Sequence, residues 1–152
     1  GGCVMGNRAV ITIKEKNVSK ENWNSLYLHW NGGRDSVEPF LHVAKLYGIR
    51  CASDPKHAIA RLAQLIGNYF GGTLSLGVGR YRSLDTDNYD NGVYIIDGFW
   101  DIVGREYMQG PEQQEYDFDE FVKDVREVND PIFGYTEDKT DPAHTITDGK
   151  VA

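Results

Sequence analysis

The chain has 152 residues and a mass of 17.1 kDa, which suits one domain with its own hydrophobic core and no need of metal or disulfide staples. Hydrophobic residues make up 40% and charged residues 26%, a balance that excludes disorder over the whole length. No apolar run is long enough to span a bilayer and no signal segment opens the chain, so we expect a cytosolic protein without a membrane partner.

The formal net charge of −7 is spread unevenly along the chain. Residues 1–84 contain 11 Lys and Arg against 5 Asp and Glu, whereas residues 85–152 contain 5 against 18. If the two halves occupy different faces of the fold, the acidic half could engage a basic partner. If the charges interleave in space, they only confer solubility.

Two strands and a helix open the predicted fold. Residues 8–14 alternate around apolar positions, and residues 25–30 follow after a polar connection, so a β-hairpin is the simplest link. A helix follows the "NGG" turn, with Asp35 as its N-cap, Glu38 completing a capping box and Gly48 at its end.

The second half of the pattern begins with a helix over residues 53–70, which has Ser53 or Asp54 as its N-cap and ends at two glycines. Three strands follow, within residues 73–83, 92–97 and 100–107. The turn-rich connections between them favour an antiparallel meander. A short acidic amphipathic helix over residues 117–128 comes last.

The order β-β-α-α-β-β-β-α is typical of the α+β class, and we expect an antiparallel β-sheet of about five strands packed against two or three helices. Residues 5–128 would form a single globular domain. Residues 129–152 have no sustained period and predict a flexible acidic tail. Residues 1–4 precede Met5 and are interpreted as an expression remnant.

The stretch "YLHWNGGRDS", residues 27–36, has the composition of an anion-binding loop. Backbone N–H groups at a helix N-terminus, freed by glycines and backed by an arginine, can hold a phosphate or a carboxylate. The candidate ligand-binding residues are His29, Asn31, Gly32, Gly33, Arg34 and, from a later strand, Arg80. The loop matches neither a P-loop nor a dinucleotide fingerprint. The alternative is a plain strand-to-helix corner in which Asp35 caps the helix.

Other chemistry finds little support in the sequence. The loop at residues 85–92 fails the spacing of a calcium-binding EF-hand, and its Asn91-Gly92 pair suits a hairpin turn. No nucleophile motif and no metal-ligand spacing occurs, so we expect no catalytic residue, no cofactor and no metal. Arg80 and Arg82 flank Tyr81, but two basic residues beside an acidic half make direct nucleic-acid binding the weaker hypothesis.

The acidic helix offers a candidate protein-binding surface. Its carboxylates are Asp117, Asp119, Glu120, Asp124 and Glu127. Such a row could imitate a phosphate backbone toward a host protein, including one that binds nucleic acid, or it could be a solvated helix face.

Four stretches, "MGNRAVIT", "YLHWNGGRDSVEPFL", "RLAQLIGNYFGGTLSLGVG" and "GVYIIDGFWDIVGRE", resemble a family of small, uncharacterised proteins carried by bacteriophages and integrative elements of Gram-positive bacteria. The resemblance implies a phage or mobile-element protein in the host bacterial cytosol, where small acidic proteins act as anti-defence inhibitors of the anti-CRISPR or anti-restriction type. It carries over no catalytic residue. We therefore expect a non-catalytic binding protein that uses its acidic C-terminal half, with a nucleotide- or phosphate-binding module as the alternative.

Overall fold

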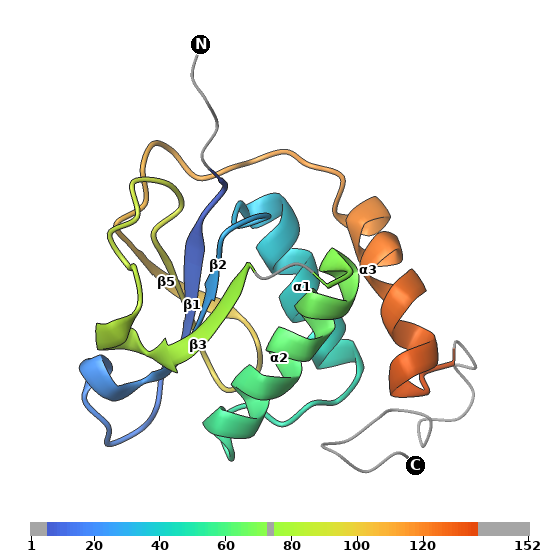
Figure 1. The fold of residues 1–152 in the computed structure, drawn as a ribbon, viewed down its shortest axis with the longest axis horizontal. Coiled ribbons are helices and arrows are strands. Elements are labelled where there is room, and N and C mark those ends of the chain that lie inside the picture. The colour runs from blue at the N-terminus through green and yellow to red at the C-terminus, as the bar shows by residue number, and fades with distance from the viewer. Residues whose placement is uncertain (1–5, 73–74, 137–152) are drawn as a thin grey trace.

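The computed structural model describes residues 6–72 and 75–136, and its sheet is built around a central apolar strand (Figure 1). All five residues of β1 (Ala9–Ile13) are buried. β1 pairs antiparallel with β2 (Asn24–Leu28), and a short helical turn, η1 (Lys20–Asn22), lies in the connection between them. The predicted hairpin is thereby confirmed. Residues 1–4 and 137–152, which carry the predicted remnant and most of the predicted tail, lie outside the described residues.

The five strands have the order β3-β2-β1-β4-β5. β3 (Leu76–Arg80) pairs antiparallel with β2, and β5 (Ile102–Glu106) pairs antiparallel with β4 (Val93–Ile96). β1 and β4 run parallel, so the sheet is mixed. The predicted α+β class with five strands is confirmed, and antiparallel pairing holds for every neighbouring pair except β1 and β4.

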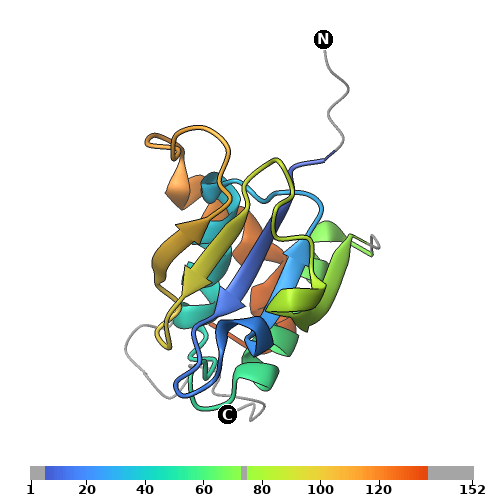
Figure 2. The same ribbon diagram turned by 90° about the vertical axis from the view of Figure 1, so that its left-hand side faces the viewer.

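The predicted meander of β3, β4 and β5 is wrong, because β3 and β4 lie on opposite sides of the β1–β2 pair. The segment between β3 and β4 crosses the open face of the sheet, beginning with a helical turn, η2 (Tyr81–Ser83) (Figure 2). Tyr81 packs there with Val10 and Val93 in a small second core. Burial of these side chains draws the chain across the sheet, and β4 then enters beside β1.

Three helices cover the other face in two layers (Figures 1 and 2). α1 (Arg34–Leu46) and α2 (Pro55–Phe70) share the main core with the strands, and α3 (Phe118–Phe133) packs on both of these helices. Asp54 caps α2 as predicted, accepting the N–H of His57. No helix within the described ranges is long and apolar enough to cross a membrane.

The last helix is longer than the predicted 117–128 and includes residues that were assigned to the tail. It continues through Pro131 to Phe133, which stacks on Tyr47 with ring centroids 5.0 Å apart. Asn129 is fully buried against α2. Its amide donates to the carbonyls of Leu65 and Val125 at 3.0 and 2.9 Å, and Asn68 donates to its oxygen at 2.9 Å. The bonds to Leu65 and Asn68, both in α2, fasten α3 to the layer beneath it.

Replacing this buried amide should weaken the docking of α3. We expect Asn129→Ala to lower the free energy of unfolding by about 1–3 kcal/mol, because the carbonyl of Leu65 and the amide of Asn68 lose a buried partner. Urea unfolding followed by tryptophan fluorescence measures the change. Val128→Ala is the control from the adjacent, more exposed position and should alter stability by less than about 0.5 kcal/mol. Equal effects of the two variants would contradict an anchoring role for the amide.

Candidate functional site

The predicted binding loop is a tight corner that turns β2 into α1. Asn31 takes a left-handed conformation, with φ of 56°, and its side chain donates to Ser36 Oγ at 3.1 Å. Gly32 donates its N–H to the carbonyl of Asn7 at 2.8 Å. A Cβ at Gly32 would lie 2.5 Å from that carbonyl oxygen, so only glycine fits where the corner meets the start of β1.

The first turn of α1 differs from the prediction. Its N-cap is Gly33, which has no side chain to act as a cap. The side-chain amide oxygen of Gln113, Oε1, caps the helix instead and accepts a hydrogen bond from the N–H of Asp35 at 3.0 Å. The predicted capping box of Asp35 and Glu38 is therefore wrong, because a side chain distant in sequence does the capping and Glu38 binds Arg34.

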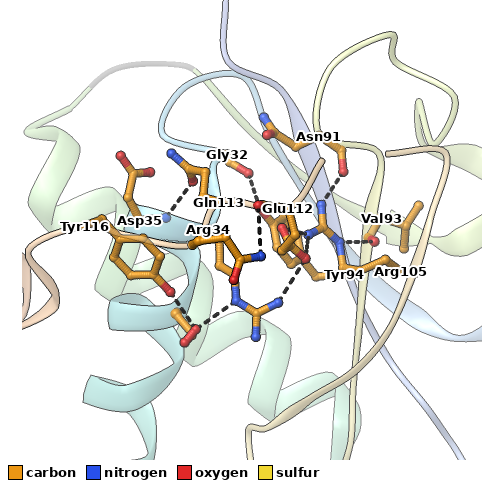
Figure 3. Close-up of polar contacts among 12 residues, drawn as sticks. Gly32, Arg34, Asp35, Asn91, Val93, Tyr94, Arg105, Glu112, Gln113 and Tyr116 are labelled. Atoms are coloured by element: carbon orange, nitrogen blue, oxygen red, sulfur yellow. Dashed lines mark hydrogen bonds and ion pairs between the residues drawn. The ribbon is translucent and has the colours of Figure 1, made fainter. Parts of the chain in front are cut away.

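Gln113 belongs to a strap, residues 107–117, that leads from β5 across one end of the molecule to α3 (Figure 1). The strap also delivers Glu112, whose carboxylate lies between two arginines (Figure 3). Arg34 Nη1 is 2.9 Å from Glu112 Oε2, and Arg105 Nη1 bonds to both carboxylate oxygens. We call Arg34, Arg105 and Glu112 the Glu112 clamp.

Arg105 is positioned by three further contacts with β4 and its flank. Its Nε donates to the carbonyl of Val93 at 3.0 Å and its Nη2 to that of Asn91 at 2.6 Å. The guanidinium lies 3.6 Å from the centroid of the Tyr94 ring, within cation–π range. The Tyr94 hydroxyl in turn donates to the carbonyl of Gly32 at 2.7 Å, so Tyr94 connects the clamp to the corner.

The electrostatics keep the clamp ionised at neutral pH. Partial burial alone would raise the pKa of Glu112, but hydrogen bonds and charges from Arg105 and Arg34 outweigh it and lower that pKa. The pKa of Arg34 is raised, since Glu38 and Glu112 together outweigh the opposing effect of burial. Tyr116, which donates to Glu38 at 2.7 Å, has its pKa raised to about 12 by burial and by that bond.

The structure brings most of the predicted ligand residues together but not all of them. Asn31, Gly32, Gly33 and Arg34 share the corner, and His29 lies just before it, with its Nδ1 2.9 Å from the Tyr27 hydroxyl. Arg80 is the exception. It pairs with Asn24, at the far end of β3 from Leu76, which pairs with Leu28 beside the corner. The two ends are four residue steps apart along the strand, or about 13 Å, so Arg80 does not belong to this cluster.

The anion-binding features of the corner are already satisfied by the strap. Glu112 binds the Arg34 guanidinium, and Gln113 accepts a hydrogen bond from the N–H of Asp35 at the start of the helix. A phosphate or nucleotide at this corner stays a prediction, and such a ligand would have to displace both side chains. Sequence reasoning missed Glu112 and Gln113 because they stand in the aperiodic loop "MQGPEQQEY", 78 residues beyond their partners.

The loop at residues 85–92 has a structural duty. Buried Asn88 accepts the N–H of Gly92, and Asp90 forms an ion pair with Arg8 at 3.0 Å. The predicted hairpin turn at Asn91-Gly92 is wrong, since Gly92 instead leads into β4 and accepts the N–H of Val10. Within residues 6–72 and 75–136, no group of three or more His, Cys, Asp or Glu side chains could hold a metal ion.

Cys51 is buried among core residues, and burial raises the pKa of its thiol to about 12, which removes it as a nucleophile near neutral pH.

The predicted protein-binding carboxylates divide into two groups. Asp117 is the N-cap of α3 and accepts the N–H of Glu120 at 3.1 Å. The remaining four, Asp119, Glu120, Asp124 and Glu127, are exposed on α3, and none forms an ion pair with another described residue. We call these four the acidic ridge. Val128 and Ile132, both exposed, continue the helix surface beyond it.

Comparisons with protein-family models, with curated proteins and with solved structures find no match for the chain. What the protein does is therefore inferred from the geometry of its own residues.

The Glu112 clamp predicts a pH-dependent contribution to stability. Replacing Glu112 by Gln should lower the free energy of unfolding by about 1–2 kcal/mol at pH 7, because two arginines lose their shared carboxylate. Since the folded-state pKa of Glu112 is lowered from 4.5, its contribution is present above pH 4.5 and disappears as the pH falls through the lowered value.

Chemical denaturation of wild type and Glu112→Gln between pH 7 and pH 3 measures this, and the two curves should converge in acid. Glu115→Gln, which removes an exposed carboxylate from the same strap, should follow wild type throughout. A constant difference between wild type and Glu112→Gln at all pH values would contradict the electrostatic origin.

Proposed function

We propose that this chain is a non-catalytic binding protein that engages a basic surface of a host protein through the acidic ridge of α3. The observation that carries the proposal is that four neighbouring carboxylates are exposed on α3 and unpaired among the described residues. Some carboxylates elsewhere on the molecule, such as Glu38, Asp90 and Glu112, are held in ion pairs, and exposed ones such as Glu21 and Glu115 do not stand in a row along one helix. Asp119 and Glu120 lie in the first turn of α3, where negative charge suits the helix dipole, whereas Asp124 and Glu127 form no ion pair within residues 6–72 and 75–136.

The spacing of the ridge suits a linear contact. Glu120, Asp124 and Glu127 follow one another at i, i+4 and i+7, so they form a stripe about 10 Å long, and exposed Lys123 lies beside it as one positive charge. A stripe of this kind presents charge to a partner much as a strand of phosphates does, and it would steer a basic surface toward α3.

Exposed apolar side chains beside the stripe could be buried in a contact with a partner. Val128 is 39% exposed and Ile132 is 55% exposed, and both lie further along the same helix. Complementary charge contributes mainly to the rate and specificity of association, while buried apolar contacts at the centre of an interface supply much of its affinity. α3 offers both within about four turns.

The resemblance to proteins of phages and mobile elements gives this partner a setting. Host defence nucleases bind DNA or RNA through Lys and Arg side chains that contact phosphates. A protein that covers such a surface with carboxylates would act as an anti-defence inhibitor of the anti-CRISPR or anti-restriction type without catalysing a reaction.

Charge reversal on the ridge tests the proposal. We expect the double variant Asp124→Lys, Glu127→Lys to retain at least about tenfold less of the partner in affinity capture from host cells, because attraction becomes repulsion at the contact. These two positions avoid the first turn of α3, where a lysine would oppose the helix dipole. Retained proteins are identified by mass spectrometry, and the affinity of the purified partner is then measured by calorimetry.

The matched control is Glu21→Lys, Asp87→Lys, which makes the same change in net charge at two exposed positions outside α3. It should retain the partner as wild type does. If both double variants lose the partner equally, bulk charge rather than the ridge is responsible. Unchanged capture by the ridge variant would reject the proposed mode of binding.

A further inference from the structure

A groove of about 280 Å³ opens between α1, the start of β5 and the first residue of α3. Its apolar lining comes from Leu41 and Trp100, which are buried, and from Ile102 and Phe118, which are partly exposed. The polar lining comes from one face of α1 and from Asp101. The volume lies just below the usual range for drug-sized ligands, so the groove suits a molecule with a single ring or a short chain.

The charges at one end of the groove are already satisfied. Arg34 binds Glu38 and Glu112, each at 2.9 Å, and Glu38 also accepts the hydroxyl of Tyr116. A ligand gains little from charged groups that would first have to leave such partners. Recognition by charge therefore has to occur at the other end.

At that end, a single ion pair joins the two walls. Lys45 Nζ is 2.7 Å from Asp101 Oδ1, and the two side chains are 47% and 56% exposed. A pair this exposed contributes little to stability, and its partners can exchange with groups from solution. His42 lies one turn before Lys45 on the same face of α1, with its ring edge-on to Phe118 at 5.2 Å between centroids.

The partly buried surroundings of His42 disfavour its protonated form. Burial lowers the pKa of His42, and the charges of Lys45 and Arg126 lower it further, against an opposing effect from Asp119. Glu38, one turn earlier on the groove face of α1, is neutralised by Arg34. The imidazole is thus neutral at pH 7 and retains one N–H donor.

We propose that this groove binds a small amphipathic carboxylic acid. The apolar body of the ligand lies on Leu41, Trp100 and Phe118. Its carboxylate takes the place of Asp101 at Lys45 Nζ and accepts the imidazole N–H of His42, while Asp101 turns to solvent. An amine in the same groove would meet the Lys45 ammonium, and the two carboxylates of the lining, Glu38 and Asp101, are already paired with Arg34 and Lys45. This site does not use Asp124 or Glu127, the two ridge carboxylates whose reversal tests the proposed function.

The test is an NMR titration of the folded chain with 3-phenylpropionate, 3-phenylpropan-1-ol and 3-phenylpropylamine, which share one apolar body. We expect saturable shifts for the Trp100 indole and for α1 with the acid, and binding at least about tenfold weaker with the alcohol and the amine. Equal affinity for the acid and the amine, or no saturable shift with the acid, would overturn the proposal.

Substitutions of the two partners in the Lys45–Asp101 ion pair should change the affinity for the acid in opposite directions. Lys45→Met should weaken binding of 3-phenylpropionate about tenfold or more, because the ammonium is lost while the apolar stem remains. Asp101→Asn should strengthen it several-fold, since Lys45 no longer has a competing carboxylate. Lys56→Met removes an exposed lysine on α2 as the control and should bind as wild type does. Binding that is the same in Lys45→Met and wild type would remove Lys45 from the site and reject the proposal.

Discussion

The arrangement of this molecule depends on one carboxylate held by two arginines. Glu112 arrives on a strap with few apolar anchors, and it binds Arg34 at the start of α1 and Arg105 in β5. The clamp therefore joins an edge strand of the sheet, the first turn of a helix and the connection that leads to α3. The Arg105 side chain is only 12% exposed and also donates to the carbonyls of Val93 and Asn91, so its position in the clamp is fixed. Because Arg105 binds Glu112 on the strap, the place where α3 begins is fixed by the same contact.

The same clamp explains why a loop with the composition of an anion site is a structural corner. Arg34 and the free N–H groups of α1 attract negative and carbonyl oxygens, as the sequence pattern indicates, and the chain supplies those oxygens itself through Glu112 and Gln113. Glu112 and Gln113 thus bind the groups that the sequence pattern offers to an anion. A composition-based argument cannot distinguish these cases, since the occupant lies 78 residues away in a segment without periodicity.

The elements themselves could be predicted because each one has a local signal. The apolar spacing of α1 and α2, the cap at Asp54 and the alternation of β1 are properties of short windows. Strand neighbours are not local properties, and β4 lies beside β1 because Tyr81 and Val93 bury themselves on the open face of the sheet. The predicted end of α3 lies too early because residues 129–152 show no sustained period, whereas Asn129 is stabilised by hydrogen bonds to α2 that no window of the sequence reveals.

Asn129 also determines which way α3 faces. Apolar side chains alone tolerate some rotation of a helix on the layer below. The hydrogen bond from the Asn129 amide to the Leu65 carbonyl, together with the bond from the Tyr47 hydroxyl to Asp130 at 2.6 Å, narrows that range. Glu120 precedes Asn129 by nine residues, and at about 100° per residue it points in the opposite direction. The buried asparagine thus restricts rotation of α3 about its axis. The charged stripe is thereby held facing away from the core.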